Sequence, residues 1–124
     1  MPDDLITDNL QDIISSIELI EKRFKGIAGA DDLVVGEDGM LILDSICMRL
    51  QVIGELLTKI QKLDPSILGK YSEIEWQNIM KLRDIISHHY EHVDHEIIYD
   101  ICKNHLPNLK KAVLSIYRDQ ISSS

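Results

Sequence analysis

One short stretch, Met80 to Asp94, holds most of the side chains in this 124-residue chain that could carry chemistry. It reads MKLRDIISHHYEHVD and includes Arg83, His88 and Tyr90. An arginine and a histidine can together act on a phosphodiester without a metal ion. The imidazole moves a proton on or off a hydroxyl group, while the guanidinium binds the phosphate oxygens. We therefore take Arg83 and His88 as a candidate catalytic pair.

The spacing of this pair raises a geometric difficulty. On a straight α-helix, Arg83 and His88 lie about 140° apart around the axis and roughly 7.5 Å apart along it, so they do not share a face. They can converge if the helix ends near His89, which frees the histidine to turn, or if a second copy of the chain completes the site. The competing interpretation is chance, because an arginine and a histidine at this spacing are not by themselves a specific signal.

The same stretch also allows a metal-binding interpretation. His88, His92 and His95 fall at positions i, i+4 and i+7 of one helix face, and such histidines bind borderline metal ions. However, Asp94 is a typical N-cap residue and predicts a helix break between them. The Glu-x-x-His pairs of carboxylate-bridged di-iron bundles are also absent from the sequence. We therefore expect no metal ligands here, and we expect His92 and His95 to be solvated or interface residues.

Composition limits the class of protein. The length fits one domain, 1–124, with 120–124 as a tail, and the single Phe and single Trp predict an aliphatic core. The formal net charge of -8 argues against a general nucleic-acid coat protein, which would carry a basic face. Cys47 and Cys102 form no C-x-x-C pair, which predicts buried thiols of a reducing compartment. No apolar run has the length of a signal or of a membrane span, so we expect a cytoplasmic protein with no membrane partner.

Apolar residues in alternating steps of three and four predict helices packed side by side along much of the chain. The first stripe is Ile6–Phe24, behind an acidic N-terminal cap, and a second helix is expected over residues 40–63. Between them, residues 26–39 are rich in glycine and acids and should form one long mobile loop. Gly54 inside the second helix predicts the close approach of a neighbouring helix.

A third helix is expected over residues 73–89, because Ser72 and Glu75 match a capping box. Asp94 should cap a fourth helix, which Pro107 either kinks or restarts. The sequence shows no strand-type alternation. The predicted fold class is therefore all-α: an antiparallel up-and-down bundle of four long helices, the last either whole or split in two.

Several side chains near the candidate pair keep two interpretations. Glu55 is either a solvated helix residue, which we slightly favour, or a buried acid that orients Arg83. Trp76 belongs either to the core or to a dimer interface. The lysines near the third helix form either a modest basic edge or ordinary solvated surface: Lys59, Lys62, Lys70 and Lys81.

At these residues the sequence resembles a known family. Arg83-x4-His88-x-Tyr90 matches the RX4HXY motif of HEPN-domain proteins of the HepT-like (DUF86) group. Flanking segments over about residues 5–117 are similar as well: Ile53-Gly54-Glu55, Trp76, Val93-Asp94, Ile97-Ile98-Tyr99 and Leu106-Pro107-x-Leu109. The departures are small. Glu75 replaces a common proline, and Glu91 stands where an aromatic residue is usual.

The resemblance implies an all-helical, HEPN-like homodimer in which two motifs meet in a shared cleft. It implies a metal-independent ribonuclease with no cofactor, acting on RNA such as tRNA rather than on DNA, as the toxin of a HEPN/MNT (type VII) toxin–antitoxin module. Arg83 and His88 would be catalytic, with Asp84 in a supporting role. The antitoxin would be a minimal nucleotidyltransferase of the MntA type that transfers AMP from ATP to Tyr90. The alternative is a non-catalytic HEPN protein that binds a nucleotide or presents it to a partner nucleotidyltransferase.

Overall fold

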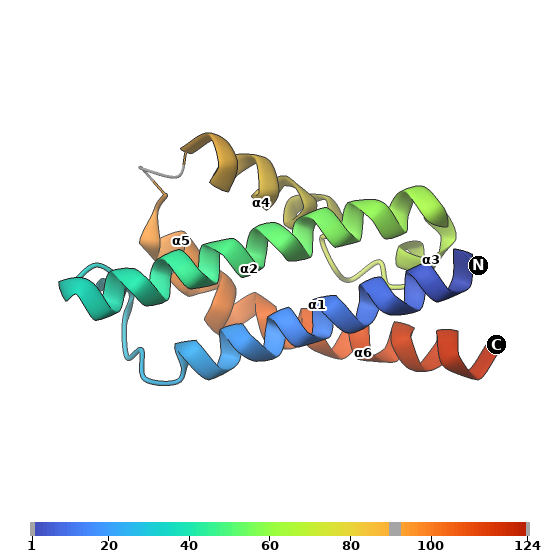
Figure 1. Cartoon of the computed structure of the whole chain (residues 1–124), viewed down its shortest axis with the longest axis horizontal. Coiled ribbons are helices and arrows are strands. Elements are labelled where there is room, and N and C mark those ends of the chain that lie inside the picture. Colours follow the sequence, from blue (N-terminus) through green and yellow to red (C-terminus); the bar gives the residue numbers. More distant parts are fainter. Residues whose placement is uncertain (1, 90–92, 124) are drawn as a thin grey trace.

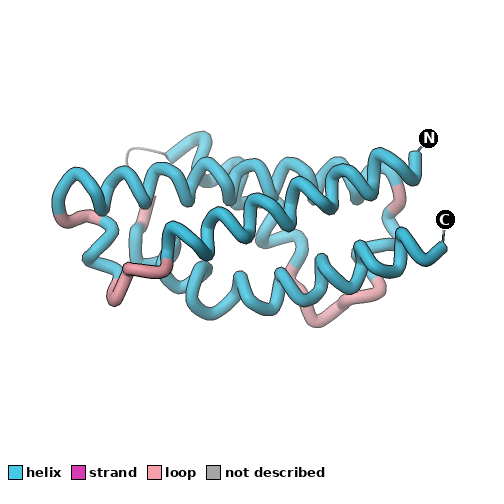
Figure 2. The backbone as a smooth tube through the Cα atoms, turned by 60° about the horizontal axis from the view of Figure 1, so that its bottom comes forward, coloured by secondary structure: helices cyan, strands magenta, loops and turns pink. Residues whose placement is uncertain are grey.

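A computed structural model of the chain describes residues 2–89 and 93–123, which are almost entirely helical (Figure 1). The helices are α1 (Pro2–Phe24), the 3-10 helix η1 (Ala30–Leu33), α2 (Gly36–Leu63), α3 (Pro65–Gly69), α4 (Trp76–His89), α5 (His95–Asp100), the π-helix η3 (Ile101–His105) and α6 (Leu106–Ser123). Figure 2 shows loops only as short connections, and no described residue forms a strand, which confirms the all-α prediction. Within the described part of the chain, no helix combines the length and hydrophobicity needed to cross a membrane.

The long helices form an antiparallel bundle around an aliphatic core. Helix α1 packs against α2 on one side and α6 on the other, and α4 packs against α2 (Figure 1). Phe24, at the end of the predicted stripe of α1, is partly buried against the core, and five other residues of the stripe are buried: Ile6, Leu10, Ile13, Ile17 and Ile20. Burial of each such side chain contributes about 1.5–3 kcal/mol, so this stripe is a main source of stability.

The connection between α1 and α2 is more helical than the sequence predicted. Helix α2 begins at Gly36 rather than at Met40, and η1 occupies part of the predicted loop 26–39. The Asp32 carboxylate accepts hydrogen bonds from the backbone amides of Ala28 and Gly29, at 2.8 and 3.2 Å. These bonds fold the segment onto itself. Glycine and aspartate are common loop residues, and here they build a compact 3-10 turn instead.

The third long helix, α4, begins later than predicted, at Trp76, because the capping box of Ser72 and Glu75 does not form. The Trp76 indole N–H instead donates to the Tyr71 carbonyl oxygen at 3.0 Å and holds residues 72–75 in a turn. The Glu75 carbonyl accepts the first amides of the helix, so Glu75 takes the N-cap position. Trp76 itself is only 8% exposed, which assigns it to the core of the chain.

The last long helix is continuous in hydrogen bonding but not in type. Asp94 caps α5 as predicted, because its carboxylate accepts the Glu96 amide at 2.8 Å. The π-helix η3 then precedes Pro107, with the Leu106 amide donating to the Ile101 carbonyl oxygen. Proline has no amide to donate, and a π turn shifts the hydrogen-bond pairing by one residue ahead of it. The predicted interruption at Pro107 therefore takes the form of a π-helical insertion.

The sequence predicted the close approach of a neighbouring helix at Gly54, and in the structure this helix is α4. A Cβ atom on Gly54 would lie 2.9 Å from the carbonyl oxygen of Ile79 and 3.3 Å from that of Met80. Glycine inside a helix costs about 1 kcal/mol relative to alanine. The close contact between backbones explains why glycine stands here.

We expect Gly54→Ala to lower the free energy of unfolding by about 1–3 kcal/mol, because the two carbonyl groups of α4 cannot move aside as the end of a side chain would. Gly69→Ala is the matched control, since Gly69 is also helical and an added Cβ there meets nothing within 4 Å. Urea unfolding of both variants and the wild type measures the difference. A Gly54→Ala protein as stable as Gly69→Ala would contradict the close approach.

Candidate functional site

Arg83 lies in the middle of α4, on the side that faces α2. Its Cβ is 3.5 Å from the position that a Cβ on Gly54 would take, so the missing side chain leaves room for the stem of the arginine. The Arg83 Nε lies 3.6 Å from Asp84 Oδ1, and the two side chains are 45% and 64% exposed. An exposed pair of this kind contributes little to stability. The guanidinium is thus at the surface, where it can meet a phosphate.

His88 belongs to the last turn of α4, which runs as one α-helix from Trp76 to His89. The helix therefore keeps Arg83 and His88 about 140° apart around its axis. This agrees with the sequence prediction and with the predicted end of the helix. The side chain of His88 lies outside the described part of the structure, as do the residues Tyr90 and His92.

A hydrogen bond ties the last turn of α4 to α2. The Gln51 side-chain amide donates to the Ser87 hydroxyl at 2.9 Å. Ser87 stands four residues after Arg83, and Gln51 stands three residues before Gly54. The sequence analysis did not select this pair. Gly54 could have pointed to this pair. Two antiparallel helices that meet at Gly54 and Arg83 bring Gln51 next to Ser87 about one turn away.

The charged residues beside the site are solvated. Glu55 is exposed and lies 3.7 Å from Lys59, so it is the solvated helix residue that we favoured and not a buried acid that orients Arg83. All the lysines considered for a basic edge are exposed as well: Lys59, Lys62, Lys70 and Lys81. Among the described residues, the charge contact that the structure places on Arg83 is the one with Asp84.

His95 is the one histidine of the metal-binding interpretation whose side chain the structure describes. It is 27% exposed, and its Nε2 lies 3.3 Å from Oδ1 of Asp31 in η1. Glu96 also brings a carboxylate close enough to form a three-residue group. The carboxylates are exposed, and the histidine–aspartate contact itself explains the arrangement, since it links α5 to η1. His95 is thus an interface residue within the chain.

Both cysteines are buried, as predicted. Burial raises the pKa of Cys47 to about 11, with a further contribution from Asp44. Burial likewise raises the pKa of Cys102 to about 12. The thiolate is the reactive form of cysteine, and burial disfavours it at both positions near neutral pH.

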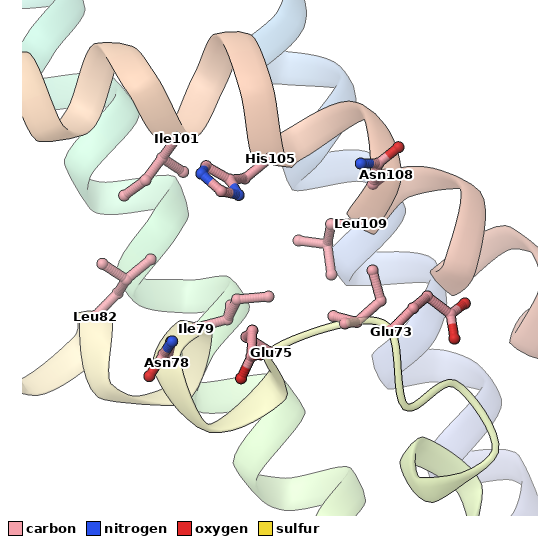
Figure 3. Close-up of a pocket in the computed structure, with 10 residues that line it drawn as sticks. Glu73, Glu75, Asn78, Ile79, Leu82, Ile101, His105, Asn108 and Leu109 are labelled. Carbon is pink, nitrogen blue, oxygen red and sulfur yellow. The ribbon is translucent and has the colours of Figure 1, made fainter.

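A cavity of about 390 Å³ lies between the start of α4 and the η3–α6 segment (Figure 3). Its apolar lining is Ile74, Ile79, Leu82, Ile101 and Leu109, and its polar lining is Glu73, Glu75, Asn78, His105 and Asn108. Arg83 is not part of this lining, and neither is any lysine. The two carboxylates disfavour a phosphate. The cavity is therefore a poor candidate for RNA binding, and the exposed surface around Arg83 is the better one.

Comparison with known proteins identifies the family of the chain. A family model described as "Ribonuclease HepT-like" matches residues 13–116, which is most of the chain. The chain belongs to the ribonuclease HepT-like family. The matched range includes all three positions of the HepT-like motif, Arg83, His88 and Tyr90, together with the Gly54 contact beneath Arg83.

Similar proteins are found in Thermococcus cleftensis and Methanocaldococcus jannaschii. "Probable ribonuclease HepT" of Thermococcus cleftensis is 30% identical over 103 residues, which cover 83% of this chain and 87% of that protein. "Putative RNase MJ0127" of Methanocaldococcus jannaschii is 35% identical over 75 residues, 60% of each chain. In the same organism, "Gamma-glutamylcyclotransferase and putative RNase MJ0434" is 31% identical over 110 residues, 89% of this chain and 46% of that protein. The HepT-like chain thus spans less than two thirds of both M. jannaschii relatives. No solved structure matches it.

Proposed function

We propose that this HepT-like protein is a metal-independent endoribonuclease. The observation that carries the proposal is the Arg83-x4-His88-x-Tyr90 motif in a member of a ribonuclease family, with Arg83 exposed on α4. His88 takes the proton of a ribose 2′-hydroxyl as its oxygen attacks the phosphorus, and the bond to the 5′ oxygen breaks. The leaving oxygen needs a proton from a second acid. Arg83 binds the phosphate oxygens as negative charge develops on them.

We propose a homodimer as the working unit, because α4 alone keeps Arg83 and His88 on different faces. A two-fold interface can bring both motifs into one cleft. There, His88 of the partner subunit can supply the proton that the leaving oxygen needs. Apolar side chains on the outer faces of α2 and α4 are half exposed or more, and burying them would favour such an interface: Leu41, Met48 and Ile85.

We further propose that the protein is the toxin of a HEPN/MNT (type VII) module, with RNA such as tRNA as its substrate. Its partner is a minimal nucleotidyltransferase of the MntA type. The Tyr90 hydroxyl attacks the α-phosphorus of ATP, pyrophosphate leaves, and AMP remains as an ester on Tyr90. In this proposal the added phosphate binds the guanidinium of Arg83 in place of the substrate phosphate and so blocks cleavage.

We expect RNA cleavage by the purified protein to persist in excess EDTA, because Arg83 and His88 supply charge and proton transfer without a metal ion. The measurement is the rate of cleavage of a labelled RNA with and without the chelator. A metal-dependent nuclease in the same buffer is the control that the chelator is effective. Activity that disappears in EDTA and returns with Zn²⁺ or Mn²⁺ would contradict metal-independent catalysis.

One observation favours the second candidate, a non-catalytic protein that binds a nucleotide or presents it to a nucleotidyltransferase. The chain carries a formal charge of -8, and Asp84 stands next to Arg83, so a long RNA would meet general repulsion. A single nucleotide carries fewer phosphates and would meet less of it. Cleavage of RNA by the wild-type protein, lost on replacement of Arg83, excludes this alternative.

A further inference from the structure

Two residues of α2 contact α4 close to the proposed catalytic pair, one at Arg83 and one at Ser87. Gly54 faces Arg83. Gln51 donates to Ser87, the residue immediately before His88, at 2.9 Å. Because the helices are antiparallel, one turn back along α2 corresponds to one turn forward along α4. Helix α2 therefore contacts α4 beside both members of the catalytic pair.

Few described side chains near the last turn of α4 are buried against the rest of the chain. Within residues 83–87, Ile86 is buried, whereas the other four residues are exposed. Burial of an apolar side chain holds the helix against the core but has no preferred direction, so it only loosely sets the rotation of the helix end about its axis. A hydrogen bond has a preferred distance and angle and does restrict this rotation. The Gln51–Ser87 bond is such a restraint on the last turn.

We propose that Gln51 is a positioning residue for His88. Its hydrogen bond to Ser87 restrains the last turn of α4 relative to α2, and His88 belongs to this turn. The inference rests on the proposed ribonuclease function and extends it to a residue outside the RX4HXY motif. The effect on rate follows from geometry, because misplacing a reacting group by about 1 Å can reduce catalysis about 10²-fold.

The expected result is a loss of kcat without a matching rise in KM. Gln51→Ala and Ser87→Ala should each lower kcat roughly tenfold, because His88 is misdirected while Arg83 still binds phosphate. The double variant should be no slower than either single variant, because both remove the same bond. Ser87→Thr keeps the hydroxyl and should retain most of the activity. Gln77→Ala, an exposed glutamine in the first turn of α4, is the matched control and should keep wild-type kcat.

Hydrogen exchange provides a readout that does not need activity. In Gln51→Ala, amides in the last turn of α4 should exchange faster than in the wild type, while those of α1 stay unchanged. Faster exchange together with lower kcat supports the proposal. An active wild type whose Gln51→Ala variant keeps full kcat overturns it, and so do losses that add in the double variant. An inactive wild type overturns the ribonuclease function instead, and unchanged exchange would then also overturn the positioning by Gln51.

Discussion

Replacing either Arg83 or His88 by alanine will lower RNA cleavage by a factor of about 10² or more and will make expression of the protein harmless. In the proposed mechanism, Arg83→Ala removes the group that binds the phosphate oxygens, and His88→Ala removes the proton carrier. The Arg83 side chain is exposed, so its loss should leave thermal stability nearly unchanged. Cleavage of a labelled RNA by the purified proteins and growth of cells that express them measure the two effects.

Matched substitutions elsewhere separate catalysis from general charge effects. Arg118→Ala and His105→Ala remove the same residue types at exposed positions of α6 and η3 and should keep wild-type activity. Arg83→Lys retains the positive charge but not the forked hydrogen-bond donors of the guanidinium. Its cleavage rate should lie between those of Arg83→Ala and the wild type. An Arg83→Ala or His88→Ala protein that cuts RNA at the wild-type rate would refute the assignment of that residue.

The same His88→Ala variant tests whether one cleft uses both copies of the chain. If base and acid come from the two His88 side chains of a dimer, only dimers with two wild-type copies are active. Equal mixing after subunit exchange should then leave about a quarter of the activity, because dimers form at random. A site contained within one copy would retain about half. A linear fall of activity with the wild-type fraction would therefore contradict the shared cleft.

Much of the bundle can be predicted from the sequence because burial follows helical periodicity. The stripe Ile6–Phe24 specifies the inward face of α1. Gly54 predicts the close approach of a neighbouring helix, which the structure identifies as α4. The start of α4 could not be predicted in this way. Ser72 and Glu75 match a local capping rule, but the hydrogen bond from Trp76 to Tyr71 creates a turn that this rule does not consider.

The candidate site likewise has one part that the sequence predicts and one part that it does not. Arg83 was predicted as a candidate site residue from its type and its spacing from His88. The structure places its side chain, 45% exposed, on α4. The hydrogen bond from Gln51 to Ser87 depends on the register of two helices that lie far apart in the sequence. Local spacing contains no information on that register until one contact, here at Gly54, fixes it. Residues outside the motif that contact its helix therefore cannot be identified from local spacing in a single sequence.

Tyr90→Phe will remain toxic but will escape enzymatic control by a partner nucleotidyltransferase. The substitution keeps the aromatic ring and removes only the hydroxyl that we propose as the AMP acceptor, so the protein should fold normally. Wild-type protein incubated with ATP and a minimal nucleotidyltransferase should gain one AMP by mass spectrometry and lose its RNA cleavage, because the new phosphate competes for Arg83. Tyr90→Phe should gain no AMP and keep cutting, and its toxicity should persist when the partner is co-expressed.

The rate of RNA cleavage by Tyr90→Phe shows whether the Tyr90 hydroxyl serves regulation alone or also catalysis. If the Tyr90 hydroxyl served only as the AMP acceptor, Tyr90→Phe and the unmodified wild type would cut RNA at equal rates. A hydroxyl that also positions RNA would give a slower Tyr90→Phe beside an active wild type. The proposed control is wrong if AMP is attached to Tyr99 or Tyr117 instead, and each can be tested by its own phenylalanine variant. Should the wild type neither harm cells nor cut RNA, while still accepting AMP at Tyr90, the nucleotide-presenting function would replace the ribonuclease.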